Sequence, residues 1–130
     1  MLLPTTLSLA AAAALINLWL SIRCGQIRTR EKISVGTGGN DMLERRMRAQ
    51  LNFVENTPFV LILIAGLELA GKGGAWLPIV GGVYMLGRVG HGLGMDGGSL
   101  GIGRMIGTLT TMLTLVGLGV MAVLVATGRY

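Results

Sequence analysis

The chain has 130 residues, of which 52% are hydrophobic and 13% are charged, and its mean hydropathy is +0.67. A soluble domain of this size is less apolar, so the composition excludes one and predicts an integral membrane protein. The net charge of +5 does not indicate nucleic-acid binding, because the basic residues lie beside apolar stretches without stacking aromatics; membrane orientation and anionic head groups explain them.

Four apolar stretches follow one another along the chain, and each has about the ~20 residues that a ~30 Å hydrocarbon layer requires. They cover roughly residues 2–22, 47–70, 76–95 and 104–127, and the fourth becomes continuously apolar from Ile106. The connections are short except for 23–46, whose glycine-rich centre, Gly36 to Asn40, is typical of a turn. We therefore expect an all-α membrane protein in which residues 1–130 form one bundle of four transmembrane helices.

Basic residues predict the orientation of the bundle. The second connection has only Lys72 and the C-terminus only Arg129, whereas the first connection and its borders carry Arg23, Arg28, Arg30, Lys32, Arg45, Arg46 and Arg48. Because basic loops stay inside, we expect the first and third connections to be cytoplasmic and both termini to lie outside. No Lys or Arg precedes the first stretch, so we expect a retained helix rather than a cleaved leader.

Small and weakly polar residues have structural interpretations. Gly87, Gly90 and Gly94 are spaced so that neighbouring helices could approach closely. The single cysteine, Cys24, cannot form an intrachain disulfide or a cysteine-rich metal site, and we expect no metal. The segment from Gly92 to Gly97 has the letters of a dinucleotide fingerprint but ends a membrane helix, so it is a false match.

Two further polar positions inside or beside the helices also have structural interpretations. Asn17 is expected to form a hydrogen bond between helices. Glu68 and Lys72, at a spacing of four, are expected to form a solvated pair at the outer surface.

A stripe of polar residues enters the second apolar stretch. On a helix, Asn52 and Glu55 lie about 40° and about 20° to either side of Arg48, so the three share one side. Arg88 and His91 follow one turn apart in the third stretch and Arg104 begins the fourth, all toward the same membrane face. One interpretation is an internal salt-bridge network around Arg48, Glu55 and Arg88 that only specifies packing; the other is a binding pocket.

The charges of the stripe indicate the ligand that such a pocket would hold. Several cations face one carboxylate, Glu55, which suits a polyanionic small molecule that also carries an amino group. Glutathione has that pattern, with carboxylates for arginines, an amino group for Glu55 and amides for Asn52. Arg104, near a helix start, would then favour the thiolate form of its sulfur.

Three motifs resemble one family. The pattern Arg48-Ala49-Gln50-x-Asn52-x-x-Glu55-x-x-Pro58 is similar to the second-helix signature of the MAPEG family, membrane-associated proteins in eicosanoid and glutathione metabolism. Arg88-x-x-His91 and the interval to Arg104 resemble the members that synthesise prostaglandin E. The segment from Arg28 to Ser34 and the glycine turn resemble the small bacterial members.

The resemblance implies a homotrimer in a bacterial inner membrane, with glutathione bound between subunits near the cytoplasmic face and a lipophilic substrate entering from the bilayer. Arg104 would be the catalytic residue that stabilises the thiolate. The implied glutathione-binding residues are Arg28 or Arg30, Arg48, Asn52, Glu55, Arg88 and His91. Several members have a glutathione-contacting tyrosine where this chain has Met95; the nearest hydroxyl on that helix is that of Tyr84, about three turns away.

Three functions remain open from the sequence. The leading one is a glutathione-dependent transferase or peroxidase that attacks lipophilic electrophiles or lipid hydroperoxides. A non-catalytic membrane ligand-binding trimer is the first alternative, which Met95 favours. A small proton-coupled efflux transporter using Glu55 is the second; Arg48 nearby argues against it, because that cation would keep the carboxylate ionised.

Overall fold

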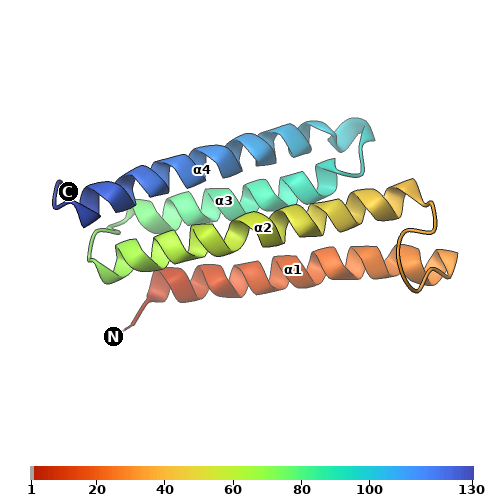
Figure 1. Ribbon diagram of the computed structural model, residues 1–130, viewed down its shortest axis with the longest axis horizontal. Coiled ribbons are helices and arrows are strands. Elements are labelled where there is room, and N and C mark those ends of the chain that lie inside the picture. The colour runs from red at the N-terminus through yellow and green to blue at the C-terminus, as the bar shows by residue number, and fades with distance from the viewer. Residues whose placement is uncertain (1) are drawn as a thin grey trace.

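In the computed structural model, which describes residues 2–130, four helices form one elongated bundle (Figure 1). Helix α1 spans Pro4–Glu31, α2 Asp41–Leu69, α3 Trp76–Gly94 and α4 Ile102–Ala126, with a short 3-10 turn, η1, at Gly98–Leu100. The described residues contain no strand. The predicted all-α fold is therefore confirmed.

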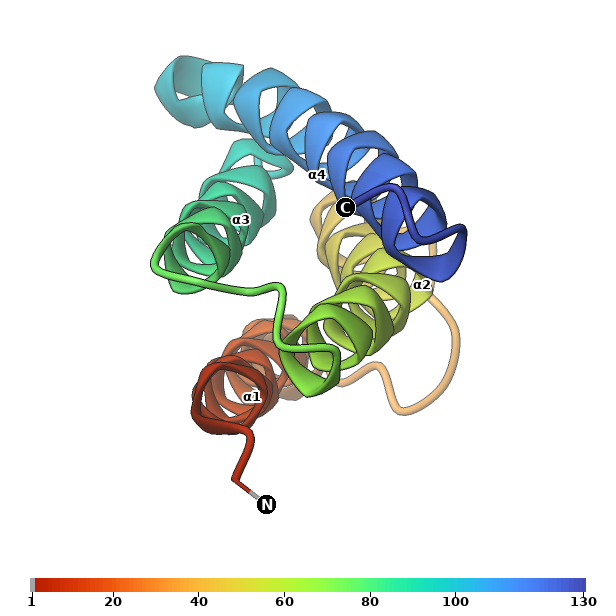
Figure 2. The same ribbon diagram turned by 90° about the vertical axis from the view of Figure 1, so that its left-hand side faces the viewer.

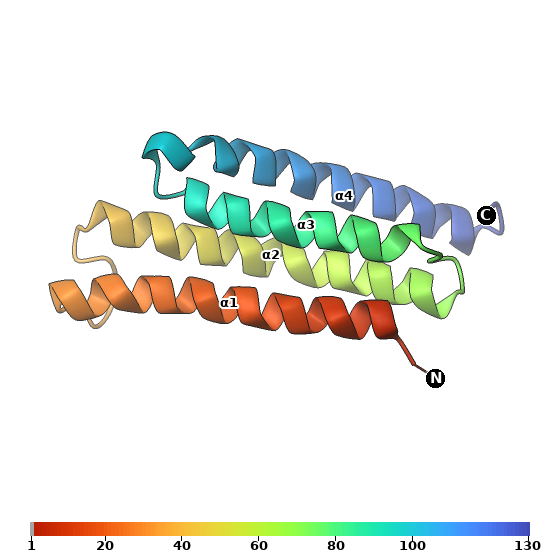
Figure 3. The same ribbon diagram turned by 180° about the vertical axis from the view of Figure 1, so that it is seen from behind.

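The helices are arranged around the central pair α2 and α3. Viewed along the bundle, α1 lies on one side of this pair and α4 on the other (Figure 2), and α1 and α4 make no contact with each other. Both chain ends lie at the same end of the bundle, opposite the first and third connections (Figure 3). Both of those connections therefore lie at one end of the bundle, and most of the basic residues lie in them or on the helical turns beside them.

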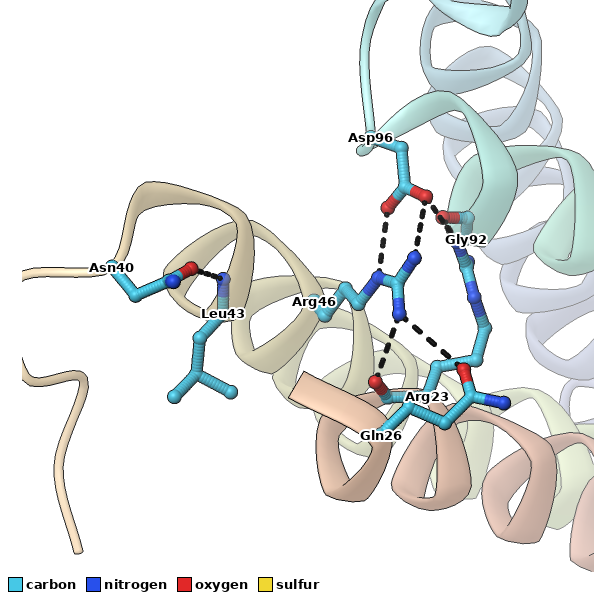
Figure 4. Close-up of polar contacts among 7 residues, drawn as sticks. All are labelled: Arg23, Gln26, Asn40, Leu43, Arg46, Gly92 and Asp96. Atoms are coloured by element: carbon cyan, nitrogen blue, oxygen red, sulfur yellow. Dashed lines mark hydrogen bonds and ion pairs between the residues drawn. The ribbon is translucent and has the colours of Figure 1, made fainter. Parts of the chain in front are cut away.

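The first two helices extend beyond the apolar stretches that predicted them. Helix α1 continues to Glu31, and Lys32 ends it in the left-handed conformation with φ 56°. Helix α2 begins at Asp41 because the Asn40 side chain accepts a hydrogen bond from the Leu43 backbone N–H at 2.8 Å (Figure 4). The predicted long connection 23–46 therefore shrinks to residues 32–40, and Arg23, Arg28, Arg45 and Arg46 lie on helices.

Three segments are long and apolar enough to cross a membrane, namely α1, α2 and η1 together with α4. Helix α3 has 19 residues but is not apolar enough, because it includes Arg88, His91 and several glycines. In the most apolar 18 residues of each of the other three segments, between 17% and 28% is buried inside the bundle. Most of their surface is thus apolar and outward-facing, as hydrocarbon requires.

Glycines allow the backbones of α3 and α4 to approach each other closely. A Cβ added at Gly94 would lie 2.1 Å from the backbone N of Arg104, and one added at Gly103 would lie 2.4 Å from the Gly90 carbonyl oxygen. The same holds for Gly107, whose Cβ would lie 2.5 Å from the Gly87 oxygen. The predicted close approach along the third helix is confirmed, and its partner is α4.

Two expectations for single polar residues had different outcomes. Asn17 accepts a hydrogen bond from Gln50 Nε2 at 3.3 Å, which confirms its role between helices. The prediction of a solvated Glu68–Lys72 pair was wrong. Glu68 accepts hydrogen bonds of 2.9 Å from the backbone N–H groups of Thr5 and Thr6, because the first turn of α1 has no other acceptors for them.

Candidate functional site

The predicted polar stripe of α2 separates into an outward and an inward part. Arg48 and Glu55 are exposed on the surface of the single chain, whereas Asn52 between them is half-buried. None of the four ion pairs among residues 2–130 includes Arg48, Glu55 or Arg88. The internal salt-bridge network that the sequence allowed is therefore absent from the described chain.

The inward part is a hydrogen-bonded cluster around Arg88, which is 1% exposed. Its Nη2 donates to Asn52 Oδ1 at 2.6 Å and its Nη1 donates to Thr111 Oγ1 at 2.9 Å. The guanidinium also lies 6.0 Å from the centre of the Phe53 ring. Arg88 thus links α2, α3 and α4 and fixes the orientation of the Asn52 amide. Thr111 was not predicted, although a threonine on the inner side of an apolar helix is a usable signal.

His91 follows Arg88 by one turn and is buried at 4% exposure. It packs against Gly107 of α4, and its Nδ1 has no hydrogen-bond partner among the described residues. Tyr84 is also buried, and its hydroxyl shares a 2.9 Å hydrogen bond with Thr57. Tyr84 is therefore part of the helix packing and does not reach the position of Met95.

An open groove of about 830 Å³ runs between α1 and α2 on the side of the predicted site. Arg28 and Arg48 line it from opposite helices, together with Cys24, Thr37 and Gln50. Arg28 also donates to the Gly36 carbonyl at 2.8 Å, so it shapes the first connection. Such a volume is within the range of small-ligand sites, about 300–1,000 Å³.

Arg30 lies on a different part of the surface. It lines a separate shallow hollow with Ile22 and Gln26, and its Nε lies 3.3 Å from the Glu31 carboxylate. Of the two arginines that the sequence left open, the structure therefore brings Arg28 to Arg48.

A smaller hollow of about 300 Å³ adjoins the groove at Arg48. It brings Arg48 of α2 to Arg104 in the first turn of α4, with Met95 at the end of α3. Its acidic residues are Asp41, which pairs with Arg45 at 2.8 Å, and Glu44. Glu44 also lines the groove.

The two hollows together carry a positive surplus. Arg28, Arg48 and Arg104 have no ion-pair partner within the described part of the chain, and Glu44 is the one acidic lining residue outside an ion pair. Guanidinium groups that have no ion-pair partner bind carboxylates and thiolates well. The surface suits a small anionic ligand.

Glu55 lines neither hollow and forms no ion pair with Arg48 or any other described cation. The sequence argument that Arg48 holds this carboxylate ionised therefore has no contact behind it. Glu55 nevertheless lies on the exposed side of α2, not in a passage through the bundle.

The ion pairs that do bridge the helices converge on Asp96, directly after α3 (Figure 4). Arg23 of α1 and Arg46 of α2 both donate to its carboxylate, Arg46 through Nη2 at 3.1 Å and Nε at 3.3 Å. Arg23 also donates to the Gly92 carbonyl at 2.9 Å. Sequence reasoning missed this cluster, although Asp96 is the one acidic residue after Glu68.

The sequence model described as the MAPEG family matches residues 6–124 of the chain. That range includes all of α2 and α3, all but the first two residues of α1 and the last two of α4, and every residue of the groove and the hollow. No curated protein matches the chain.

Proposed function

Because this chain belongs to the MAPEG family, which includes glutathione transferases and peroxidases, we propose that it is a membrane-embedded, glutathione-dependent transferase or peroxidase. The observation that carries the proposal is the pair Arg48 and Arg104. They come from different helices, line one hollow, and have no ion-pair partner among residues 2–130. An anionic tripeptide would supply the negative charge that neutralises these two cations.

We propose the following binding roles, of which those of Asn52 and Glu55 concern side chains that line neither the groove nor the hollow. Arg28 and Arg48 face the groove and would hold the carboxylates of glutathione. Asn52, oriented by the buried arginine of α3, would serve the amides. Glu55, exposed on the next turn, would bind the amino group, and His91 would support the inner wall of the site.

Arg104 has the catalytic role in this proposal. It lies in the first turn of α4, so its guanidinium and the positive end of the helix act together on an anion in the hollow. Lowering a thiol pKa by about two units requires about 2.7 kcal/mol of differential stabilisation, a plausible contribution from one cation and a helix end. The thiolate sulfur of bound glutathione would bond to an electrophilic carbon, either expelling a leaving group with its bonding electrons or adding to a polarised double bond whose other atom then takes a proton. With a hydroperoxide it would bond to the outer oxygen while the O–O bond breaks, which gives glutathione sulfenic acid and an alkoxide that takes a proton from water.

The exposed charges also support assembly. Arg48, Glu55 and Arg104 face outward from the single chain, and charged groups that face lipid are costly. A second copy placed over this side would cover them and complete the site, as in the proposed homotrimer. In this proposal the protein lies in a bacterial inner membrane, with the site near the cytoplasmic face and a lipophilic substrate entering from the bilayer.

One observation favours a second function, a non-catalytic membrane ligand-binding trimer. Met95 lines the hollow beside Arg104, and its thioether cannot donate a hydrogen bond to a sulfur or a carboxylate. Such a protein would bind glutathione or a lipophilic ligand without forming a thiolate.

The test is to titrate glutathione into detergent-purified protein and to follow the ultraviolet absorbance of the thiolate at neutral pH. Arg104→Ala is measured alongside, with Arg129→Ala at the opposite end of the bundle as the matched arginine control. We expect a saturable signal in the wild type and in Arg129→Ala that Arg104→Ala loses. Binding without thiolate would support the non-catalytic alternative. No binding would refute the glutathione-dependent enzyme and would leave for the alternative only a ligand other than glutathione.

A further inference from the structure

The cluster around Asp96 lies directly behind the proposed site. Asp96 follows Met95, and Arg46 precedes Arg48 by two residues on α2, while Met95 and Arg48 both line the hollow. The side chains of Arg23, Arg46 and Asp96 are only 10%, 17% and 23% exposed. This ion cluster is therefore largely shielded from solvent, and it is connected to the site through the backbone on both sides.

The cluster is a polar link between α2 and the end of α3 on which the first turn of α4 packs, whereas Arg88 links α2, α3 and α4 further along the bundle. No hydrogen bond or ion pair of the described residues joins the first turn of α4 directly to α2. The first turn of α4 instead packs on the end of α3. There the backbones of Gly94 and Arg104 lie so close together that a Cβ on Gly94 would not fit between them. Asp96, two residues after Gly94, then ties this end of α3 to Arg46 of α2.

The bidentate pairing of Arg46 with Asp96 fixes the relative orientation of α2 and the end of α3. Arg46 reaches both carboxylate oxygens, through Nε and Nη2, and its Nη1 donates to the Arg23 carbonyl of α1 at 3.0 Å (Figure 4). A planar guanidinium held on two oxygens fixes orientation as well as distance. The end of α3 is thus held against two helices at once.

Asp96 also sorts the cations near the site. Its carboxylate engages Arg23 and Arg46, so these two are already paired, while Arg28, Arg48 and Arg104 stay without an ion-pair partner among residues 2–130. Without Asp96, two further arginines would lack a counter-ion beside the hollow and would compete for the same anion.

From these contacts we infer that Asp96 is a positioning residue that holds Arg104 at the distance from Arg48 at which one small anion meets both guanidinium groups. This inference rests on the proposed function, because it assigns Asp96 a part in activating the glutathione thiol. Asp96 itself touches no substrate in this scheme. It acts through Arg46 and through the end of α3.

The experiment measures the pH dependence of thiolate formation in Asp96→Asn, which keeps the shape of the side chain and removes its charge. Glutathione binding is followed separately, by equilibrium dialysis with labelled tripeptide. We expect Asp96→Asn to raise the pH at which half of the bound glutathione is thiolate by about one unit, an about tenfold change in the ionisation equilibrium, because Arg104 moves away from the sulfur. Loss of the negative charge without any movement of Arg104 would lower this pH instead, so a lower midpoint would overturn the inference. Binding at saturating glutathione persists, because Arg28 and Arg48 stay in place.

Two further variants separate positioning from loss of stability. Arg46→Gln removes the partner on α2 and leaves the Arg23 pair, so we expect a smaller change in the same direction. Glu68→Gln is the matched control, since that carboxylate also ties helices together but at the opposite end of the bundle. It is expected to lower thermal stability and to leave the pH midpoint unchanged.

The outcomes distinguish this inference from the proposed function. A wild-type signal that Asp96→Asn and Arg46→Gln leave at the same pH midpoint would overturn the inference alone. An equal change in Glu68→Gln would overturn it too, because the effect would then follow from general destabilisation. A wild type that binds glutathione without thiolate at any pH would overturn the catalytic proposal and the inference together.

Discussion

Replacing Gly94 with alanine tests whether the tight packing of α3 on α4 sets the position of Arg104. The new Cβ would lie 2.1 Å from the Arg104 backbone N and within 3.0 Å of two more backbone atoms, whereas ordinary contacts begin at 3.4 Å. The first turn of α4 would therefore have to move by about 1.3 Å, the difference between the two distances. Because the obstacle is backbone, no side-chain rotation can relieve it.

This displacement has a calculable effect on the thiolate. If the guanidinium moves from about 4 Å to about 5.3 Å from the sulfur, the attraction at an effective dielectric constant of about 20 falls by about 1 kcal/mol. That is about a fivefold change in the ionisation equilibrium, so the pH midpoint of thiolate formation should rise by about 0.7 units. The overpacking itself should cost about 1–3 kcal/mol of stability.

The assay is the pH titration of thiolate absorbance together with thermal unfolding in detergent. Gly82→Ala is the matched control, because it adds a methyl group to the same helix at a position with nothing within 4 Å. We expect this control to keep the wild-type midpoint and to be neutral or slightly stabilising. If Gly94→Ala and Gly82→Ala gave the same midpoint and the same melting temperature, the reasoning would be refuted.

Three other predictions concern single side chains. Asn52→Ala should weaken glutathione binding and also cost about 1–3 kcal/mol of stability, since it leaves a buried guanidinium nitrogen of Arg88 unpaired. Glu55→Gln should weaken binding with an unchanged melting temperature. Equal melting temperatures for the two variants would contradict this prediction. Tyr84→Phe should lower the melting temperature and leave glutathione affinity unchanged, because the hydroxyl is buried away from the hollow, and an affinity loss measured by calorimetry would contradict it. Arg28→Gln should weaken binding severalfold more than Arg30→Gln, since only the former lines the groove; dialysis measures both, and the reverse order would refute the placement.

Much of the fold followed from hydropathy, but the helix ends did not. The four apolar stretches predicted the number and order of the helices, because apolar runs of about 20 residues have few other uses. The extension of α1 to Glu31 was missed, since polar residues continue a helix readily and Gly25, the one glycine in this part of α1, does not end it. The cap at Asn40 was the available signal for the start of α2.

The candidate site was predicted in part, for a different reason. Helical periodicity predicted that Arg48, Asn52 and Glu55 share one side of α2, but it could not tell which of them would turn inward. Asn52 turns inward because Arg88 of another helix reaches it, and periodicity within one helix does not contain that contact. The Asp96 cluster was missed for the same reason, since its members are 23 to 73 residues apart in sequence.

The polar contacts between α1 and α2 have a consequence for the order of assembly in the membrane. Glu68 on Thr6 fastens one end of this helical hairpin, Gln50 on Asn17 fastens the middle, and Arg46 on the Arg23 carbonyl fastens the other end. All of these groups are synthesised before α3 begins. The α1–α2 hairpin can therefore form all of its own polar contacts before α3 is synthesised. The α3–α4 hairpin then packs against a pair of helices that is already assembled.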